Sequence, residues 1–413
     1  MNIFEGQFLA DVMTQTFVGL SSDFEFALIH GAWAFFALYL FYAMFYIRFH
    51  HKNDEFLARA EWVFLRVSVP EMPSPSIMAA EQMFTQMHGT KKPIDWRQHW
   101  VLGEQRLNFS FEIVSLGGVI RYIIRTARED VEAAKAAIYS QYPDAELAEV
   151  GDYMDAIKTP YGPDSSYDFW GCDFRLDKPD CYPIKVFENF EHRAAETILD
   201  PLAGLLEAMA NIEPEEIITV QILAVPDDED WKEAGLKEVE RLKGIKGSAA
   251  ENPDLERAPY SLMMHLSEKD KEVINGIQKK LSKLSFKAKV RVLYIAPRDK
   301  FRKKTRLSTI VGSIRQFSVA DMNSLKQNLW TETLVPTRVA ERFEGKHNAE
   351  VLLWKKRELI KNFKKRDLWG GRTYHLSTEE LGSLFHFPLE DVRKTSIEKI
   401  EARKGEPPVN LPV

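Results

Sequence analysis

The sequence lacks the short motifs that commonly mark an enzyme active site. No G-x-x-x-x-G-K-[ST] loop occurs, because the pair Gly345-Lys346 is followed by His347 and has no glycine at the required upstream position. H-E-x-x-H and G-x-S-x-G are missing too, and none of the ten histidines lies four residues from another. Each of these motifs supplies a defined set of catalytic groups. Their absence predicts a protein with no catalytic residues, no cofactor and no metal.

Cysteine is also scarce. Cys172 and Cys181 are the only two in the chain. A structural zinc site needs about four ligands, and the neighbouring sequence does not offer them. We therefore expect both side chains to be free thiols.

Basic residues are absent from residues 1 to 29, whereas Arg48, Lys52 and Arg59 follow shortly after an apolar run. This run, Phe26 to Ile47, carries one histidine and no formal charge. About 20 such residues span the hydrocarbon of a bilayer, so the run predicts a transmembrane helix. The positive-inside rule then predicts a single-pass protein of the inner membrane, with its N-terminus outside and its later domains in the cytoplasm. A buried core helix is the weaker alternative, because helices that are apolar all round are uncommon in soluble domains.

Residues 1 to 25 have apolar side chains at helical spacing. They are Phe4, Phe8, Leu9, Val12, Met13, Phe17 and Leu20. The pattern predicts an amphipathic extracytoplasmic segment that packs on a partner, with disorder as the alternative.

Residues 61 to 150 alternate between strand and helix patterns. We expect strands at Trp62 to Val69, Asn108 to Ser115, Val119 to Thr126 and Ala145 to Val150, and helices at Ser76 to His88 and Glu129 to Gln141. The first helix has Ile77, Ala80, Met83, Phe84 and Met87 on one face, and the second has Val131, Ala134, Ala137 and Ile138. The order β-α-β-β-α-β is that of a ferredoxin-like domain.

The rest of the chain predicts a second domain of the same kind. A Gly, Pro and Asp-rich linker is expected at 151–180, followed by ferredoxin-like domain 2 with a helical insertion at 181–330 and a basic, helical C-terminal segment with a Pro-rich tail at 331–413. The second domain would begin with a strand at Ile184 to Phe190, and Ser377 with Glu380 would cap a short helix. The fold class expected is α+β, with one N-terminal transmembrane helix and two tandem ferredoxin-like domains.

Positive charge is concentrated in two segments, although the net charge of the chain is only -6. The first segment contains Arg298, Lys300, Arg302, Lys303, Lys304 and Arg306, and the second contains Lys355, Lys356, Arg357, Lys361, Lys364, Lys365 and Arg366. Such clusters can neutralise the phosphates of nucleic acid or contact an acidic partner. A solvated basic face is the favoured alternative.

Several stretches together resemble a known family. They are AAEQMFTQMHG (Ala79 to Gly89), FSFEIVSLGGVIRYIIRT (Phe109 to Thr126), IYSQYPDAEL (Ile138 to Leu147), STEELGSLFHFP (Ser377 to Pro388) and KGEPPVNLP (Lys404 to Pro412). The resemblance, over residues 25 to 413, is to the membrane-anchored N-terminal region of type IV secretion-like, conjugative-type ATPases of candidate-phyla bacteria. In longer relatives this region runs into a P-loop motor domain, which the present sequence does not contain.

The resemblance implies a non-catalytic, membrane-anchored scaffold or adaptor of a type IV secretion-like transfer apparatus. Its expected partners are the membrane and a separate motor ATPase or other secretion components, with a second copy of the chain as a further one. The alternative function is a membrane-tethered nucleic-acid-binding protein that uses the basic segments 298–306 and 355–366.

Overall fold

The computed structural model describes residues 31, 33–69, 77–155, 157, 165–190, 200–243, 267–333 and 345–388. The described residues fall into two compact units, one within Met1–Ala60 and Pro93–Gln105 and the other within Glu61–Lys92 and Arg106–Val413. The predicted segment 1–25 and the Pro-rich tail lie outside the described residues.

The first unit consists of helix α2 (Trp33–Arg59) and the short η2 (Gln98–Leu102). Trp100 of η2 packs against the rings of Phe45 and Phe49, at centroid distances of 6.1 and 5.2 Å. Gly103 ends η2 with a φ of +73°, and a Cβ there would lie 2.6 Å from the backbone of α2. The absence of a side chain at this position therefore allows the close contact.

The predicted transmembrane helix is not found. In the part of the chain that the structure describes, no helix combines the length and the apolar character that crossing a bilayer requires. Helix α2 is apolar up to Ile47, but its second half carries Arg48, Lys52 and Glu55, and residues 26–30 and 32 of the predicted span lie outside the described residues. This finding contradicts both the transmembrane helix and the predicted single-pass location in the inner membrane.

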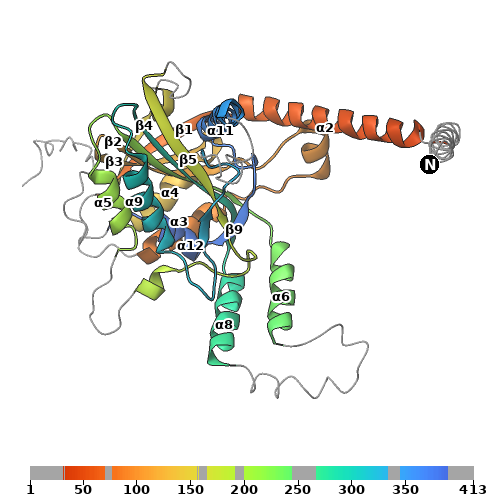
Figure 1. The fold of residues 1–413 in the computed structure, drawn as a ribbon. Coiled ribbons are helices and arrows are strands. Elements are labelled where there is room, and N and C mark those ends of the chain that lie inside the picture. The colour runs from red at the N-terminus through yellow and green to blue at the C-terminus, as the bar shows by residue number, and fades with distance from the viewer. Residues whose placement is uncertain are drawn as a thin grey trace, which may run out of the picture. The chain divides into compact units, whose positions relative to one another are not determined.

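The second unit is built on one antiparallel sheet of nine strands (Figure 1). The strands are β1 (Trp62–Ser68), β2 (Phe109–Leu116), β3 (Val119–Ala127), β4 (Glu146–Val150), β5 (Tyr167–Leu176), β6 (Ile217–Pro226), β7 (Ser285–Pro297), β8 (Leu325–Gln327) and β9 (Tyr374–Ser377). Their order is β4-β1-β3-β2-β6-β7-β5-β8, with β9 paired to β7. The sheet therefore contains strands from both predicted domains.

The prediction of two tandem ferredoxin-like domains is wrong, because the strands of both form one sheet. Strand β2, which would be the free edge of a first domain, pairs with β6 along its whole length, from Phe109↔Ala224 to Leu116↔Ile217. The order β4-β1-β3-β2 in one half of the sheet matches the order β8-β5-β7-β6 in the other. The two halves thus share a ladder of hydrogen bonds, which covers two edges that would otherwise be exposed.

One face of the sheet carries most of the helices. They are α3 (Ile77–His88), α4 (Val131–Gln141), α5 (Ala203–Ala210), α9 (Lys303–Arg315) and α12 (Thr378–Leu384) (Figure 1). The core beneath them is continuous across both halves. The apolar faces predicted for the first two of these helices are confirmed, since every predicted residue is buried. Phe84 of α3 contacts Phe111 of β2 and Phe385 after α12.

The opposite face is covered by helix α11 (Gly345–Lys365) and the single turn η4 (Tyr153–Asp155). Leu359, Ile360 and Phe363 of α11 pack on Val114 of β2 and Leu293 of β7. Central strands are therefore buried on both faces, which explains why β6 is buried at every position after Ile217 and does not alternate between buried and exposed residues.

Two differences from the predicted elements concern the second half. The strand expected at Ile184 to Phe190 does not form, and only the short 3-10 helix η5 (Phe187–Phe190) lies there. The strand that takes its position is β5, within the segment expected to be a linker. Its sequence, YDFWGCDFRL, is buried on both faces and so lacks the alternation by which a strand is recognised. The insertion consists of α6 (Trp231–Leu242) and α8 (Glu268–Ser282), which project from the sheet (Figure 1).

We expect Gly171→Ala to destabilise the second unit. A Cβ at Gly171 would lie 2.7 Å from the carbonyl oxygen of Val292 and 2.7 Å from Cδ2 of Leu359, so both the β5–β7 ladder and α11 would have to shift. Overpacking of this kind costs about 1–3 kcal/mol. Urea unfolding followed by tryptophan fluorescence measures the loss. Gly312→Ala in α9 is the matched control, because a Cβ there meets nothing within 4 Å and alanine should stabilise the helix by about 0.5–1 kcal/mol. Equal stability of Gly171→Ala and wild type would contradict the packing described.

Candidate functional site

The first basic segment does not form a free cationic surface. Lys300, Arg302 and Arg306 pair with Glu215, Glu213 and Glu216, at N–O distances of 2.6, 2.8 and 2.6 Å. Arg298 and Lys304 are exposed, and for Lys303 the structure describes only the backbone. The acidic turn before β6 therefore neutralises at least half of this segment.

The second basic segment is divided between the interior and the surface. Lys355 is buried and donates to the carbonyl oxygens of Leu329 and Glu332, at 2.9 and 3.3 Å. Lys356 pairs with Asp168. Arg366 is buried as well. Three of the residues expected to contact nucleic acid or a partner are thus structural, whereas Arg357 and Lys365 are exposed and Lys364 is half-buried. The two basic segments therefore expose fewer cations than the sequence predicts. Binding of nucleic acid stays a prediction.

Arg366 connects the end of α11 to the face of the sheet. It has a φ of +52°, and its Nε lies 3.0 Å from Oε1 of Glu112 while its Nη2 lies 2.7 Å from Oδ1 of Asp152. Glu112 also accepts hydrogen bonds from Ser110 and Tyr153. Burial raises the pKa of Glu112, but the charge and hydrogen bonds of Arg366 outweigh burial and keep that pKa below its usual range. This buried carboxylate is therefore ionised, and it holds α11 in place.

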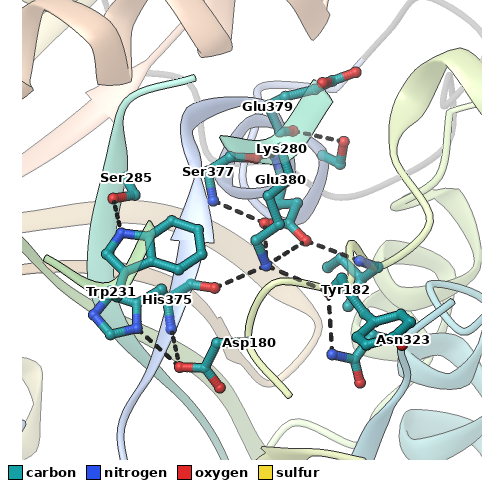
Figure 2. A network of polar contacts seen from close by, with 12 residues as sticks. Asp180, Tyr182, Trp231, Lys280, Ser285, Asn323, His375, Ser377, Glu379 and Glu380 are labelled. Carbon is teal, nitrogen blue, oxygen red and sulfur yellow. Dashed lines mark hydrogen bonds and ion pairs between the residues drawn. The ribbon is translucent and has the colours of Figure 1, made fainter. Parts of the chain in front are cut away.

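A second polar network lies where the insertion joins the sheet (Figure 2). The ring of His375 on β9 has Nδ1 2.8 Å from Oδ2 of Asp180 and Nε2 2.8 Å from Oδ2 of Asp227. The ring stacks on Trp231 of α6 at 4.9 Å and an interplanar angle of 8°, and the indole Nε1 donates to Ser285 at 2.8 Å. A ring with a carboxylate at each nitrogen is best satisfied when both nitrogens are protonated.

The pKa values in this network follow from the same contacts. Burial lowers the pKa of His375, but hydrogen bonds and charge from Asp180 and Asp227 raise it overall. Burial raises the pKa of Asp227, yet the hydrogen bond with His375 and the charge of Lys287 bring it down to about 2. The three side chains thus form an ionised cross-link between β9, the β6–α6 turn and the segment after β5. Both ring nitrogens are engaged, so His375 has none left for proton transfer to a substrate.

A buried ion pair lies beside this cross-link. Nζ of Lys280 on α8 is 3.0 Å from Oε2 of Glu380, and both side chains are 1% exposed. The same Nζ donates to the carbonyl oxygen of His375 at 2.9 Å. Glu380 accepts from the backbone nitrogens of Ser377 and Ile184, both at 2.8 Å, and the predicted capping box of Ser377 and Glu380 is confirmed. One carboxylate therefore joins α8, α12 and the segment after β5 (Figure 2).

The cysteines are confirmed as free thiols, and both are buried. Burial raises the pKa of Cys181 to about 11 and raises that of Cys172 as well. Both thiols are therefore protonated at neutral pH and weakly nucleophilic. Among the described residues, no group of three or more His, Cys, Asp and Glu side chains is arranged to hold a metal ion.

Helix α2 carries a continuous apolar surface. Its large apolar side chains from Trp33 to Ile47 are between 38% and 79% exposed, and no residue of the helix is buried. They are Trp33, Phe35, Phe36, Leu38, Tyr39, Leu40, Phe41, Tyr42, Met44, Phe45, Tyr46 and Ile47. Exposed apolar patches of this extent mark interaction sites.

The fold and its networks define an α+β protein on a single antiparallel sheet, in which buried charged groups hold peripheral elements to the sheet. Residues 55–400 match the family described as a domain of unknown function (DUF8128). The chain therefore belongs to this family. No curated protein matches it. The family description assigns neither an activity nor a partner, so the resemblance to type IV secretion-like ATPases stays a prediction.

Sequence reasoning missed the network around His375 because its members are far apart in the chain. His375 is 195 positions from Asp180 and 148 from Asp227. Neither aspartate lies in a recognisable motif with the histidine. The capping box was the one local signal at this place, and it predicted only the start of α12.

We expect the stabilising effect of His375 to decline as pH rises. Because its pKa is raised on folding, its contribution is complete below the ordinary value of 6.5 and is lost as pH rises through the folded value. Hydrogen bonds to charged groups contribute about 1.5–3 kcal/mol, so His375→Gln should cost about that much at pH 6 and clearly less at pH 9. Urea unfolding across this range measures the difference.

The control for this experiment is His51→Gln, because His51 is an exposed residue of α2. That variant should follow the wild-type curve. A cost of His375→Gln that does not change between pH 6 and 9 would show that the ring does not carry the proposed charge.

We expect Lys280→Met to destabilise the protein by about 3–5 kcal/mol, because it leaves the buried carboxylate of Glu380 without its counterion. The double variant Lys280→Met, Glu380→Gln removes both charges and should be less destabilised than the single variant. Lys271→Met is the matched control, since Lys271 of the same helix pairs at the surface with Glu268 and should change stability by about 1 kcal/mol or less. Chemical unfolding of the four proteins measures these effects. A double variant less stable than Lys280→Met would contradict the assignment.

Proposed function

We propose that this protein is a non-catalytic adaptor that docks a separate motor ATPase of a type IV secretion-like transfer apparatus. The observation that carries the proposal is the exposed apolar surface of α2, which is rich in Phe, Tyr and Trp. Aromatic residues and methionine are enriched at protein interfaces, and a few of them usually dominate the binding energy. A surface of this composition is suited to burial against another protein.

The state of the buried charged groups supports a non-catalytic role. Lys280 and Arg366 are engaged in buried ion pairs, and both ring nitrogens of His375 face carboxylates. Groups held in this way stabilise the fold, and a catalytic acid or base would need a nitrogen or oxygen that a substrate can reach.

The identity of the partner rests on the resemblance. In the longer relatives, a region similar to residues 25 to 413 runs into a P-loop motor domain. A region that is joined to a motor domain in those relatives is suited to contact such a motor, and α2 offers a surface for that contact.

The test is affinity purification of the tagged full-length chain from its native cells, with a double variant, Phe36→Ser, Phe41→Ser, in α2. Each 1.4 kcal/mol of lost binding energy is a tenfold change in affinity. Loss of two aromatic contacts of about 1–2 kcal/mol each should therefore reduce recovery of a P-loop ATPase tenfold or more. Quantitative mass spectrometry measures the recovery.

The matched control is Leu236→Ser, which removes an exposed leucine from α6 and should leave recovery unchanged. The purified wild-type chain, incubated with ATP and magnesium, should give no turnover. Absence of any P-loop ATPase from the wild-type complex, equal recovery with the α2 variant, or robust hydrolysis by the chain alone would each exclude the proposal.

A further inference from the structure

Helix α11 turns one side to the sheet and the opposite side to solvent. Its inner side packs on the sheet through buried apolar residues such as Phe363. Its outer side carries one indole ring and three cations at the spacing i, i+3, i+7 and i+11, which places them on a single face of a helix. These residues, which we call the outer stripe, are Trp354, Arg357, Lys361 and Lys365. All four are exposed.

The cations of the outer stripe are accessible to an anion from outside. Arg357 and Lys365 form no ion pair with a described residue. Lys361 is 57% exposed, and its Nζ lies 3.8 Å from Oε1 of Glu358, which is a loose contact. In the first basic segment, by contrast, Lys300 and two arginines are paired with glutamates at 2.6–2.8 Å. Of the two basic segments, the second therefore keeps the reachable positive charge.

A second exposed indole lies beside the outer stripe. Trp330 is in the turn after β8, and it lines the same cavity of about 410 Å³ as Trp354 and Lys361. Trp330 is 85% exposed and Trp354 is 61% exposed, although tryptophan is usually well buried. Lys355, the next residue after Trp354, donates to two carbonyl oxygens of the turn at 2.9 and 3.3 Å. This contact fastens the turn to α11 and holds the two indoles at one cavity.

The carboxylates of the cavity wall are mostly engaged within the fold. Asp173 is buried and pairs with Arg291 at 2.8 Å. Oδ1 of Asp367 accepts hydrogen bonds from two backbone nitrogens of the following turn, at 2.9 and 3.0 Å. Glu358 is half-exposed next to Lys361 and opposes an anion there. Its removal is therefore informative about the charge of any ligand.

We propose that the outer stripe and Trp330 bind single-stranded nucleic acid, with bases stacked on the two indoles and phosphates contacted by the three cations. Every base has a flat face that stacks on tryptophan, and exposed Lys and Arg residues contact the backbone. The stripe spans about 16 Å, because a helix rises about 1.5 Å per residue, so it can contact several phosphates. Bases of a duplex are stacked on each other and are not available to the indoles. The inference is independent of the proposed adaptor function, since it uses α11 and requires no protein partner.

The test is fluorescence anisotropy of labelled oligonucleotides of about 15 nucleotides with the purified full-length chain. The probes are oligothymidylate, oligouridylate and a DNA duplex of equal length. We expect saturable binding of single strands at about 50 mM salt, and binding of the duplex that is about tenfold weaker or less. The logarithm of the association constant should fall with the logarithm of salt concentration at a slope of about -2, because each phosphate contact on a single strand contributes about -0.7.

The tighter of the two single strands tells whether DNA or RNA is the preferred ligand, and either supports the inference. No binding of a single strand at low salt would overturn it. Equal affinity for the duplex would overturn it as well, since the indoles would then have no role.

Two indole variants assign the binding to the cavity. Trp330→Ala and Trp354→Ala alter exposed side chains, so the urea midpoint should stay that of wild type while affinity for the single strand falls about tenfold. Trp96→Ala, at an exposed tryptophan of the first unit, is the matched control and should bind as wild type does. Unchanged affinity in both cavity variants would place the ligand elsewhere and overturn the assignment.

The charge variants test the phosphate contacts. The double variant Arg357→Gln, Lys365→Gln should bind more weakly, and its salt slope should be smaller in magnitude by about 1.4. Lys237→Gln, Arg241→Gln removes the same two charges from exposed positions of α6 and should leave the slope unchanged. Glu358→Gln removes an opposing charge and should strengthen binding. An equal slope in both double variants would exclude phosphate contacts by the outer stripe.

Discussion

The pairing of β2 with β6 is the interaction on which the rest of the second unit depends. It joins two halves of equal strand order into one sheet and removes the edge that each half would otherwise expose. Because the joined strands lie in the middle of a wide sheet, both of their faces must be covered. Helices α3, α4, α5, α9 and α12 cover one face, and α11 covers the other.

Helix α11 buries several charged side chains of the sheet. Strands β2, β5 and β7 carry Glu112, Asp173 and Arg291 on that face, where water is excluded. A buried charge requires a partner, so Glu112 is paired with Arg366 and Asp173 with Arg291. These pairs fix α11 and the strands beneath it. They also explain why Arg366, the last residue of the second basic segment, lies in the interior although its sequence context predicts a solvated surface.

Some charged groups of the second unit are fully occupied by contacts within the fold. The network around His375 and Lys280 has its hydrogen-bonding capacity filled by Asp180, Asp227 and Glu380, so it anchors the α6 and α8 insertion to the sheet. By contrast, the described residues leave most of the apolar surface of α2 uncovered. Binding functions should be sought where the fold leaves such capacity unused.

The sequence by itself determined the local elements whose signals are short-range. The apolar stripes of α3 and α4, the hairpin at Gly117-Gly118 and the capping box of α12 depend on residues within a few positions of each other, and all are present. Tertiary structure alone decided that the halves share one sheet, that β5 is a strand, and that Arg366 is internal. These outcomes depend on contacts between residues far apart in the chain, such as Glu112 and Arg366 at a separation of 254 positions. Local periodicity carries no information about a contact of that kind, because the partner that removes a charge from water is chosen only when the sheet forms.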